Sequence, residues 1–184
     1  VQSRALFERA FELFNSSGDE AGTLLAWSGA VQTFLYVFDE FSPLDRWIAW
    51  LDERGGKDAS FPSPEIALMV AAGMTAALSW RNPVHPDTQK WVDRALSLSK
   101  NSPNIEASTR AYTNSAVHYL WSGMFGECGV LISELKRMVA TQPVSPLRSL
   151  VLKHTEAMFY NTSAEYQPHA LRAVTEGLKE AQKT

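Results

Sequence analysis

Four histidines and one cysteine are the residues of this chain best suited to metal binding, acid–base catalysis or nucleophilic attack. No two histidines stand four residues apart, the spacing that places two metal ligands on one face of a helix. His118 and His154 fall on different predicted helices, where Glu127 or Glu156 could complete a metal site or an acid–base pair. We expect instead that the histidines are isolated polar or core positions, with no metal ion and no cofactor.

Cys128 is the only cysteine, which excludes an internal disulfide and a metal site of several cysteines. It occupies a small-residue position of its predicted helix, which is typical of a buried small hydrophobe. The adjacent acids Asp39-Glu40 and Asp52-Glu53 point to different sides of a helix, so we expect them to be solvated rather than catalytic. The sequence contains no GxxxxGKS, GxxxxGKT, HExxH, GxSxG or CxxC motif. We therefore predict that this protein is not an enzyme.

Four Ser-Pro steps mark the elements that position these residues, at Ser42, Ser63, Ser102 and Ser145. A serine hydroxyl caps a helix N-terminus, and proline is well tolerated at the first helical position. The last three steps are separated by 39 and 43 residues, and no segment shows sustained strand alternation. Helix starts that recur about every 40 residues indicate a stacked helical repeat.

We predict an all-α fold, a right-handed α–α superhelix of about four stacked helical hairpins plus one leading helix, in a single helical-repeat domain over 1–184. The leading helix is expected over 3–15 and the hairpins over the ranges 20–54, 63–100, 103–141 and 145–181. Residues 55–62 are expected to form a flexible loop. The apolar stretch Ile66–Leu78 is too short to cross a membrane, so it indicates a buried helix. The chain begins at Val1 rather than Met, which suggests a fragment of a longer protein.

The net charge of −3 and the scattered Lys and Arg residues argue against a nucleic-acid groove, which needs clustered positive charge. We therefore expect no direct nucleic-acid binding by this segment. The single cysteine fits a reducing, cytoplasmic setting. Ordinary surface pairing is expected for the dispersed arginines Arg46, Arg54, Arg94, Arg110, Arg137 and Arg148.

Small and bulky residues recur at fixed offsets around the predicted hairpin corners, most clearly at Ala116, Tyr119, Gly123, Phe125, Cys128, Ile132 and Leu135. This frame resembles the tetratricopeptide pattern, in which small residues allow close helix crossing and an aromatic side chain plugs the corner. The corner positions Phe41, His85, Phe125 and Tyr166 differ by 44, 40 and 41 residues, more than the ~34 of the ordinary tetratricopeptide repeat.

Repeats near 40 residues with long first helices are similar to the superhelical sensor region of large MalT-like, LuxR-type ATP-dependent transcriptional activators. The opening phrase RALFERAFELFNSSGDEAGTLLAW has the same character. The resemblance implies a helical-repeat domain joined to a nucleotide-binding domain and a DNA-binding module.

The first helix of each pair lines the concave face in solenoids of this type. When the tetratricopeptide-like pattern is applied to all four predicted hairpins, it places seven side chains on the concave face. These candidates for ligand or partner binding are Tyr36, Trp80, Arg81, Arg110, Trp121, His154 and Asn161. Three aromatics in successive repeats could form a ledge on which sugars, bases or peptide side chains stack. The alternative is that they seal the interfaces between hairpins. We expect Trp47, Trp50 and Trp91 to be packing residues.

We therefore predict a non-catalytic regulatory or sensor module that binds a small effector or a protein partner on its concave face, within a transcriptional regulator. The alternative is a scaffolding module that recognises a peptide or subunit without a small ligand. A third hypothesis is an enzyme that uses His118 or His154. Phe7, Phe11 and Phe14 of the leading helix are predicted to contact a preceding repeat or a second copy, which would give a homodimer through terminal helices.

Overall fold

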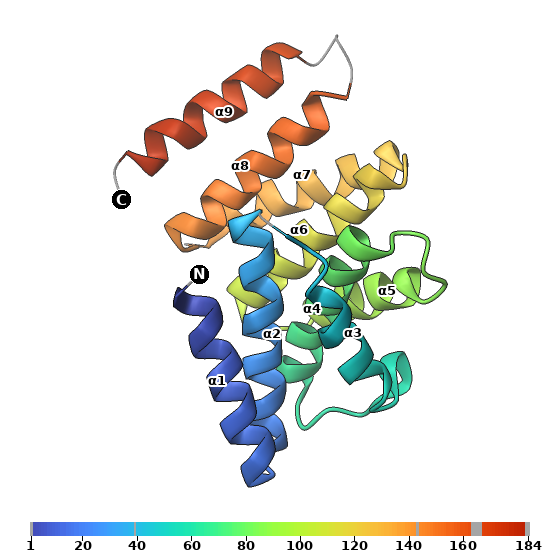
Figure 1. Ribbon diagram of the computed structural model, residues 1–184. Helices are drawn as coiled ribbons and strands as arrows, with labels where there is room; N and C mark the ends of the chain where they lie inside the picture. Colours follow the sequence, from blue (N-terminus) through green and yellow to red (C-terminus); the bar gives the residue numbers. More distant parts are fainter. Residues whose placement is uncertain (1, 39, 143, 163–166, 183–184) are drawn as a thin grey trace.

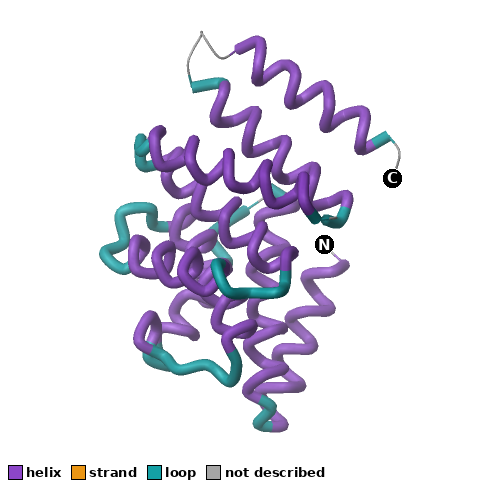
Figure 2. Tube along the Cα trace, turned by 180° about the vertical axis from the view of Figure 1, so that it is seen from behind, coloured by secondary structure: helices purple, strands orange, loops and turns teal. Residues whose placement is uncertain are grey.

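The computed structural model describes residues 2–38, 40–142, 144–162 and 167–182, and over these ranges the chain is helical without a strand (Figures 1 and 2). This confirms the predicted all-α class. The predictions for Asp39, for Tyr166 and for the start of the last helix near residue 164 fall outside the described residues. The α-helices are α1 (Gln2–Ser17), α2 (Glu20–Val37), α3 (Leu44–Asp52), α4 (Pro64–Arg81), α5 (Thr88–Ser99), α6 (Ile105–Trp121), α7 (Phe125–Thr141), α8 (Pro146–Tyr160) and α9 (Gln167–Ala181).

Helices that follow one another pack together as hairpins: α1 on α2, α4 on α5, α6 on α7 and α8 on α9. One helix of each hairpin also contacts the next in series: α2 packs on α4, α4 on α6 and α6 on α8. The helix α2 packs along α1 and also contacts α3, its partner in the predicted pair over 20–54. With nine residues, α3 covers only part of the eighteen residues of α2.

The core is built around α2 and α4, whose side chains are buried on almost every side. Trp27 of α2 is fully buried, and its indole N–H donates to the backbone carbonyl of Trp47 over 2.9 Å. Gly73 of α4 permits this packing, since a Cβ atom there would come within 2.8 Å of the Trp27 ring. Ile66–Leu78 is therefore the buried helix segment that the sequence predicts. Trp91 is buried as predicted, and Trp50 packs against the same core.

The phenylalanines of α1 face the body of their own chain. The ring of Phe7 lies over Gly29 of α2 and that of Phe14 lies over Gly22, positions where any Cβ atom would overlap the ring. Phe11 packs edge-on against both tryptophans of α3. Phe7 and Phe14 nevertheless stay more than a third exposed, and Leu6 and Leu13 are the most exposed large apolar side chains of α1.

Two of the four predicted serine caps are confirmed. The hydroxyl oxygens of Ser63 and Ser145 each accept the amide N–H three residues further on, at the starts of α4 and α8. Ser42 and Ser102 do not cap, because each hydroxyl has a closer local partner. Ser42 donates to a carboxylate two residues earlier, and Ser102 accepts the amide N–H of Asn104, which caps α6 itself.

The segment 55–62, predicted as a flexible loop, is tethered to the body of the protein. It contains a short 3₁₀ helix, Gly56–Asp58. Arg94 of α5 donates to the carbonyl oxygens of Lys57 and Ala59 over 2.7 and 2.9 Å. These two charge-assisted bonds fix the middle of the segment.

A buried carboxylate links α7 and α8. Glu156, 2% exposed, forms ion pairs with Lys136 of α7 and Lys153 of α8 at 2.9 and 3.3 Å. Lys153 also pairs with Glu176 of α9. The helix α9 lies at the outer edge of the molecule in both views (Figures 1 and 2). None of the helices in the described ranges is long and apolar enough to cross a membrane.

Candidate functional site

The inward faces of α2, α4, α6 and α8 enclose a cleft, which we call the inner cleft. Each of these helices contributes one or two turns to its wall. The helix α2 also meets α8, because Arg148 bonds to Tyr36 and His154 packs edge-on against Phe38, across more than a hundred residues of sequence. The inner cleft is lined by Gln32, Leu35, Tyr36, Phe38, Ala76, Trp80, Thr113, Asn114, Val117, Val151, His154, Thr155 and Met158.

One end of the inner cleft is aromatic, with Trp80 of α4 at its centre. The Trp80 ring stacks on Phe41, with ring centroids 4.9 Å apart and an interplanar angle of 13°. Phe38 and Trp121 meet the same ring edge-on at 5.0 and 5.6 Å. Both edge-on partners remain about half exposed, Phe38 at 50% and Trp121 at 53%. The cluster therefore keeps aromatic surface accessible beside the inner cleft.

Phe38 adopts a backbone conformation that L residues rarely occupy. It ends α2 with φ 50° and ψ 42°, and its amide N–H donates to the carbonyl of Phe34. A non-glycine residue in this left-handed region costs about 1 kcal/mol or more. The aromatic contacts to Trp80 and His154 offset this cost and hold the ring at the mouth of the inner cleft.

A polar group adjoins the inner cleft at Tyr36, which lines it: Arg148 bonds to Tyr36 from behind the lining, and the charges of Arg148 and Tyr36 act on Arg110. Arg148 is 5% exposed, and its Nη2 donates to the hydroxyl oxygen of Tyr36. Its Nε lies 3.4 Å from a carboxylate oxygen of Glu106. Burial, and to a smaller extent the charge of Arg148, lower the pKa of Arg110. We expected Arg148 to form an ordinary surface ion pair. This expectation is wrong, because the side chain is buried and bonds to Tyr36 of α2.

The structure brings three of the seven predicted residues together in the inner cleft, Tyr36, Trp80 and His154. Arg110 is outside its lining, although the charges of Tyr36 and Arg148 act on it. Trp121 touches this group through the Trp80 ring rather than through the cleft wall.

Arg81 and Asn161 lie elsewhere. Arg81 makes a two-bond ion pair with Asp45 of α3, both bonds measuring 2.7 Å. Asn161 ends α8 and borders a more open groove between α8 and α9. Sequence reasoning missed Phe38, Phe41 and Arg148, and the only sequence signal for the first two was their place at an aromatic corner between helices.

The histidines and the cysteine show no catalytic geometry in the described part of the chain. Neither His118 nor His154 shares a hydrogen bond with a carboxylate there, and burial lowers the pKa of both. Cys128 is buried, which raises the pKa of its thiol to about 11. No cluster of three or more metal-ligating side chains occurs within the described ranges.

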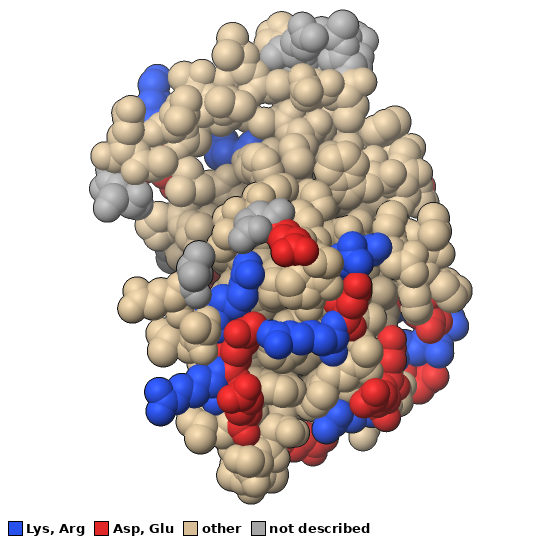
Figure 3. Space-filling model, viewed as in Figure 1, with Lys and Arg blue, Asp and Glu red and all other residues tan. Residues whose placement is uncertain are grey.

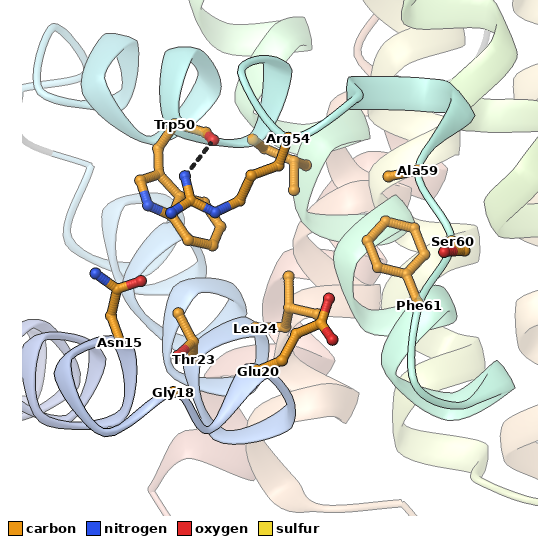
Figure 4. A pocket seen from close by; sticks show the side chains of 11 residues that line it. Asn15, Gly18, Glu20, Thr23, Leu24, Trp50, Arg54, Ala59, Ser60 and Phe61 are labelled. Carbon is orange, nitrogen blue, oxygen red and sulfur yellow. Dashed lines mark hydrogen bonds between the residues drawn. The ribbon is translucent and has the colours of Figure 1, made fainter.

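A second hollow lies between the α1–α2 turn, α3 and the segment after the 3₁₀ helix (Figure 4). Arg54 covers the ring of Trp50 with its guanidinium carbon 3.8 Å from the ring centroid, and it donates to the Trp50 carbonyl. Leu24 and Phe61 form other parts of the wall. This hollow is the larger one, but it contains none of the predicted residues and its arginine is already engaged. We therefore place the candidate site in the inner cleft.

Charged side chains on the face shown in Figure 3 gather over α1 and α3, with both signs interspersed. Ion pairs such as Arg46 with Glu8 and Arg81 with Asp45 account for this mixture. This face therefore presents no continuous basic stripe of the kind that a nucleic-acid backbone requires.

The chain matches no protein-family model, no curated protein and no solved structure.

Proposed function

We propose that this chain is a non-catalytic sensor module of a larger cytoplasmic transcriptional regulator, and that it binds a small effector in the inner cleft. In this proposal the hairpins form a right-handed superhelix of tetratricopeptide type, with α2, α4, α6 and α8 on its inner wall. The observation that carries it is the convergence of Tyr36, Trp80 and His154, from three different helices, on one cleft.

Side-chain contacts between the end of α2 and α8 favour a small effector over a long peptide, because they join the two helices across the cleft. A ligand that touches both helices would stabilise the arrangement in which the first and fourth hairpins meet. A ligand shifts the balance between this arrangement and others only if it binds them with different affinities. The attached domains would then respond to the resulting change in arrangement.

A thermal-shift screen with sugars, nucleotides and small acids tests the proposal. A ligand specific for the folded state, present at about 100 times its Kd, adds roughly 2.7 kcal/mol to the free energy of unfolding. The response should be lost in Trp80→Ala and retained in Trp50→Ala, which alters the hollow of Figure 4 and the contact with Phe11 but none of the residues that line the inner cleft. A response lost in Trp50→Ala and kept in Trp80→Ala would move the site and overturn the proposal. A reading frame with a P-loop before this segment and a helix-turn-helix after it would support the regulator class.

A peptide-binding scaffold is the second candidate function, and the groove between α8 and α9 favours it. Met158, Asn161 and Leu171 border this groove, which is more open than the inner cleft. A peptide that bound there would lose affinity in Leu171→Glu and keep it in Trp80→Ala.

A further inference from the structure

Two arginines from neighbouring inner helices, Arg110 of α6 and Arg148 of α8, have buried N–H groups without acceptors. Within the described residues, Nε of Arg110 and Nη1 of Arg148 are buried and donate to no hydrogen-bond acceptor, while Nε of Arg148 has only the ion pair with Glu106 at 3.4 Å. More than about nine tenths of buried polar groups in folded proteins have such a partner. Arg148 is itself 5% exposed, so water does not readily replace one. This cluster of unused donors therefore requires an explanation.

The local charges do not balance. Glu106 is the carboxylate that pairs with Arg148, and it already accepts the backbone N–H and the hydroxyl of Ser145 over 2.6 and 3.2 Å. Arg110 is half-buried and forms no ion pair with any residue that the structure describes; burial lowers its pKa, and the more distant charge of Glu106 opposes this only in part. A buried charge without a counter-ion is costly. A negatively charged group between the two arginines would remove this cost.

The donors suit an oxyanion. A guanidinium presents its N–H groups in a planar fork that matches the oxygens of carboxylate and phosphate. Tyr36 accepts a bond from Arg148 and keeps its own O–H hydrogen for a further acceptor. Arg4 donates to Thr33, one turn before Tyr36 on α2, and its buried Nη2 also lacks an acceptor in the described residues.

We propose that Arg110, Arg148 and the Tyr36 hydroxyl bind an oxyanion, and that the effector carries a carboxylate or phosphate group at this end of the inner cleft. This identification rests on the proposed function, because it places the acidic group of the same ligand. The body of the ligand then extends toward Trp80 and His154, which line the same cleft.

Three matched probes test the proposal: phenylphosphate, phenylacetate and the neutral phenylacetamide, each added at constant ionic strength. One or both acids should raise the melting temperature more than the amide does, and calorimetry should give the Kd. Arg110→Gln should weaken binding of the acid roughly tenfold to a hundredfold, since a bond to a charged group is lost. Arg137→Gln, which alters an exposed arginine of α7 paired with Glu134, should leave the Kd unchanged.

The stability of ligand-free Arg110→Gln separates a binding role from a structural one. Removal of an uncompensated charge should leave the melting temperature unchanged or raise it. A lower melting temperature with an unchanged Kd for the acids would overturn the proposal. Equal binding of acid and amide that is lost in Trp80→Ala would also overturn it, while leaving effector binding in the cleft intact. A preference for phenylphosphate or for phenylacetate decides which oxyanion the site takes.

Discussion

Replacement of Trp80 by alanine distinguishes a binding ledge from a seal between hairpins. Trp80 is half-buried and contacts three rings, Phe41 at 4.9 Å, Phe38 at 5.0 Å and Trp121 at 5.6 Å. Each aromatic pair contributes about 0.5–1.5 kcal/mol beyond its buried area. Two of the three partners are about half exposed, so we take values near the lower limit. We expect Trp80→Ala to lower the free energy of unfolding by about 2 kcal/mol.

Trp27→Ala is the matched comparison. Trp27 lies on α2, is fully buried and packs against α4, the helix that carries Trp80. Truncation of a buried tryptophan to alanine costs about 3–5 kcal/mol. A domain of this kind is stable by roughly 5–15 kcal/mol, so Trp80→Ala should stay folded while Trp27→Ala approaches unfolding.

Urea unfolding followed by circular dichroism gives both free energies, and ligand titration of folded Trp80→Ala gives the binding result. We expect a folded protein that no longer binds the effector. If Trp80→Ala costs as much as Trp27→Ala and the folded fraction still binds normally, Trp80 is a packing residue and the ledge does not exist.

Four further predictions concern packing, charge, pH and association. Gly73→Ala should lower the free energy of unfolding by roughly 1–3 kcal/mol in urea titrations, because its Cβ would lie 2.8 Å from the Trp27 ring. Glu156→Ala should cost about 1 kcal/mol by the same measurement, because Lys136 is half exposed and Lys153 keeps its pair with Glu176; an unchanged midpoint would argue against this ion pair. Burial lowers the pKa of His118 below its ordinary 6.5, so the unfolded chain binds a proton more readily. Stability should therefore fall as the pH drops through about 6.5, and His118→Gln should flatten that dependence in urea titrations at several pH values. Leu171, 69% exposed on α9, should support self-association that Leu171→Glu reduces in sedimentation velocity.

The elements that follow from short-range chemistry could be read from the sequence. Ser63-Pro64 and Ser145-Pro146 start helices because the cap and the proline act within one turn. The buried course of α4 follows from its apolar composition. Ser42 and Ser102 show the limit of this reasoning, since a competing local hydrogen bond decided each case and the same dipeptide permits both outcomes.

The site was predictable only in part. The contacts at its aromatic end join neighbouring hairpins, whereas the bond at its polar end joins residues far apart in the sequence. Trp80 and Trp121 occupy equivalent positions of neighbouring hairpins, so a repeat frame brings them together. The bond between Tyr36 and Arg148 joins residues 112 positions apart, on helices with five other α-helices between them in the chain. No periodicity in the sequence reports a contact at this distance, so Arg148 could not be distinguished from a surface arginine.

The start of α8 is both a structural joint and part of the proposed binding site. Ser145 caps the helix and is held by Glu106 of α6, while Arg148, three residues later, bonds to α2. An anion that draws Arg110 toward Arg148 would compete with Glu106 for the same guanidinium and thereby act on the contact between α6 and α8. Ligand binding and the angle between the third and fourth hairpins would then depend on the same few charges. This is the coupling that a sensor module requires, since an effector changes a conformation only where it interacts differently with the alternatives.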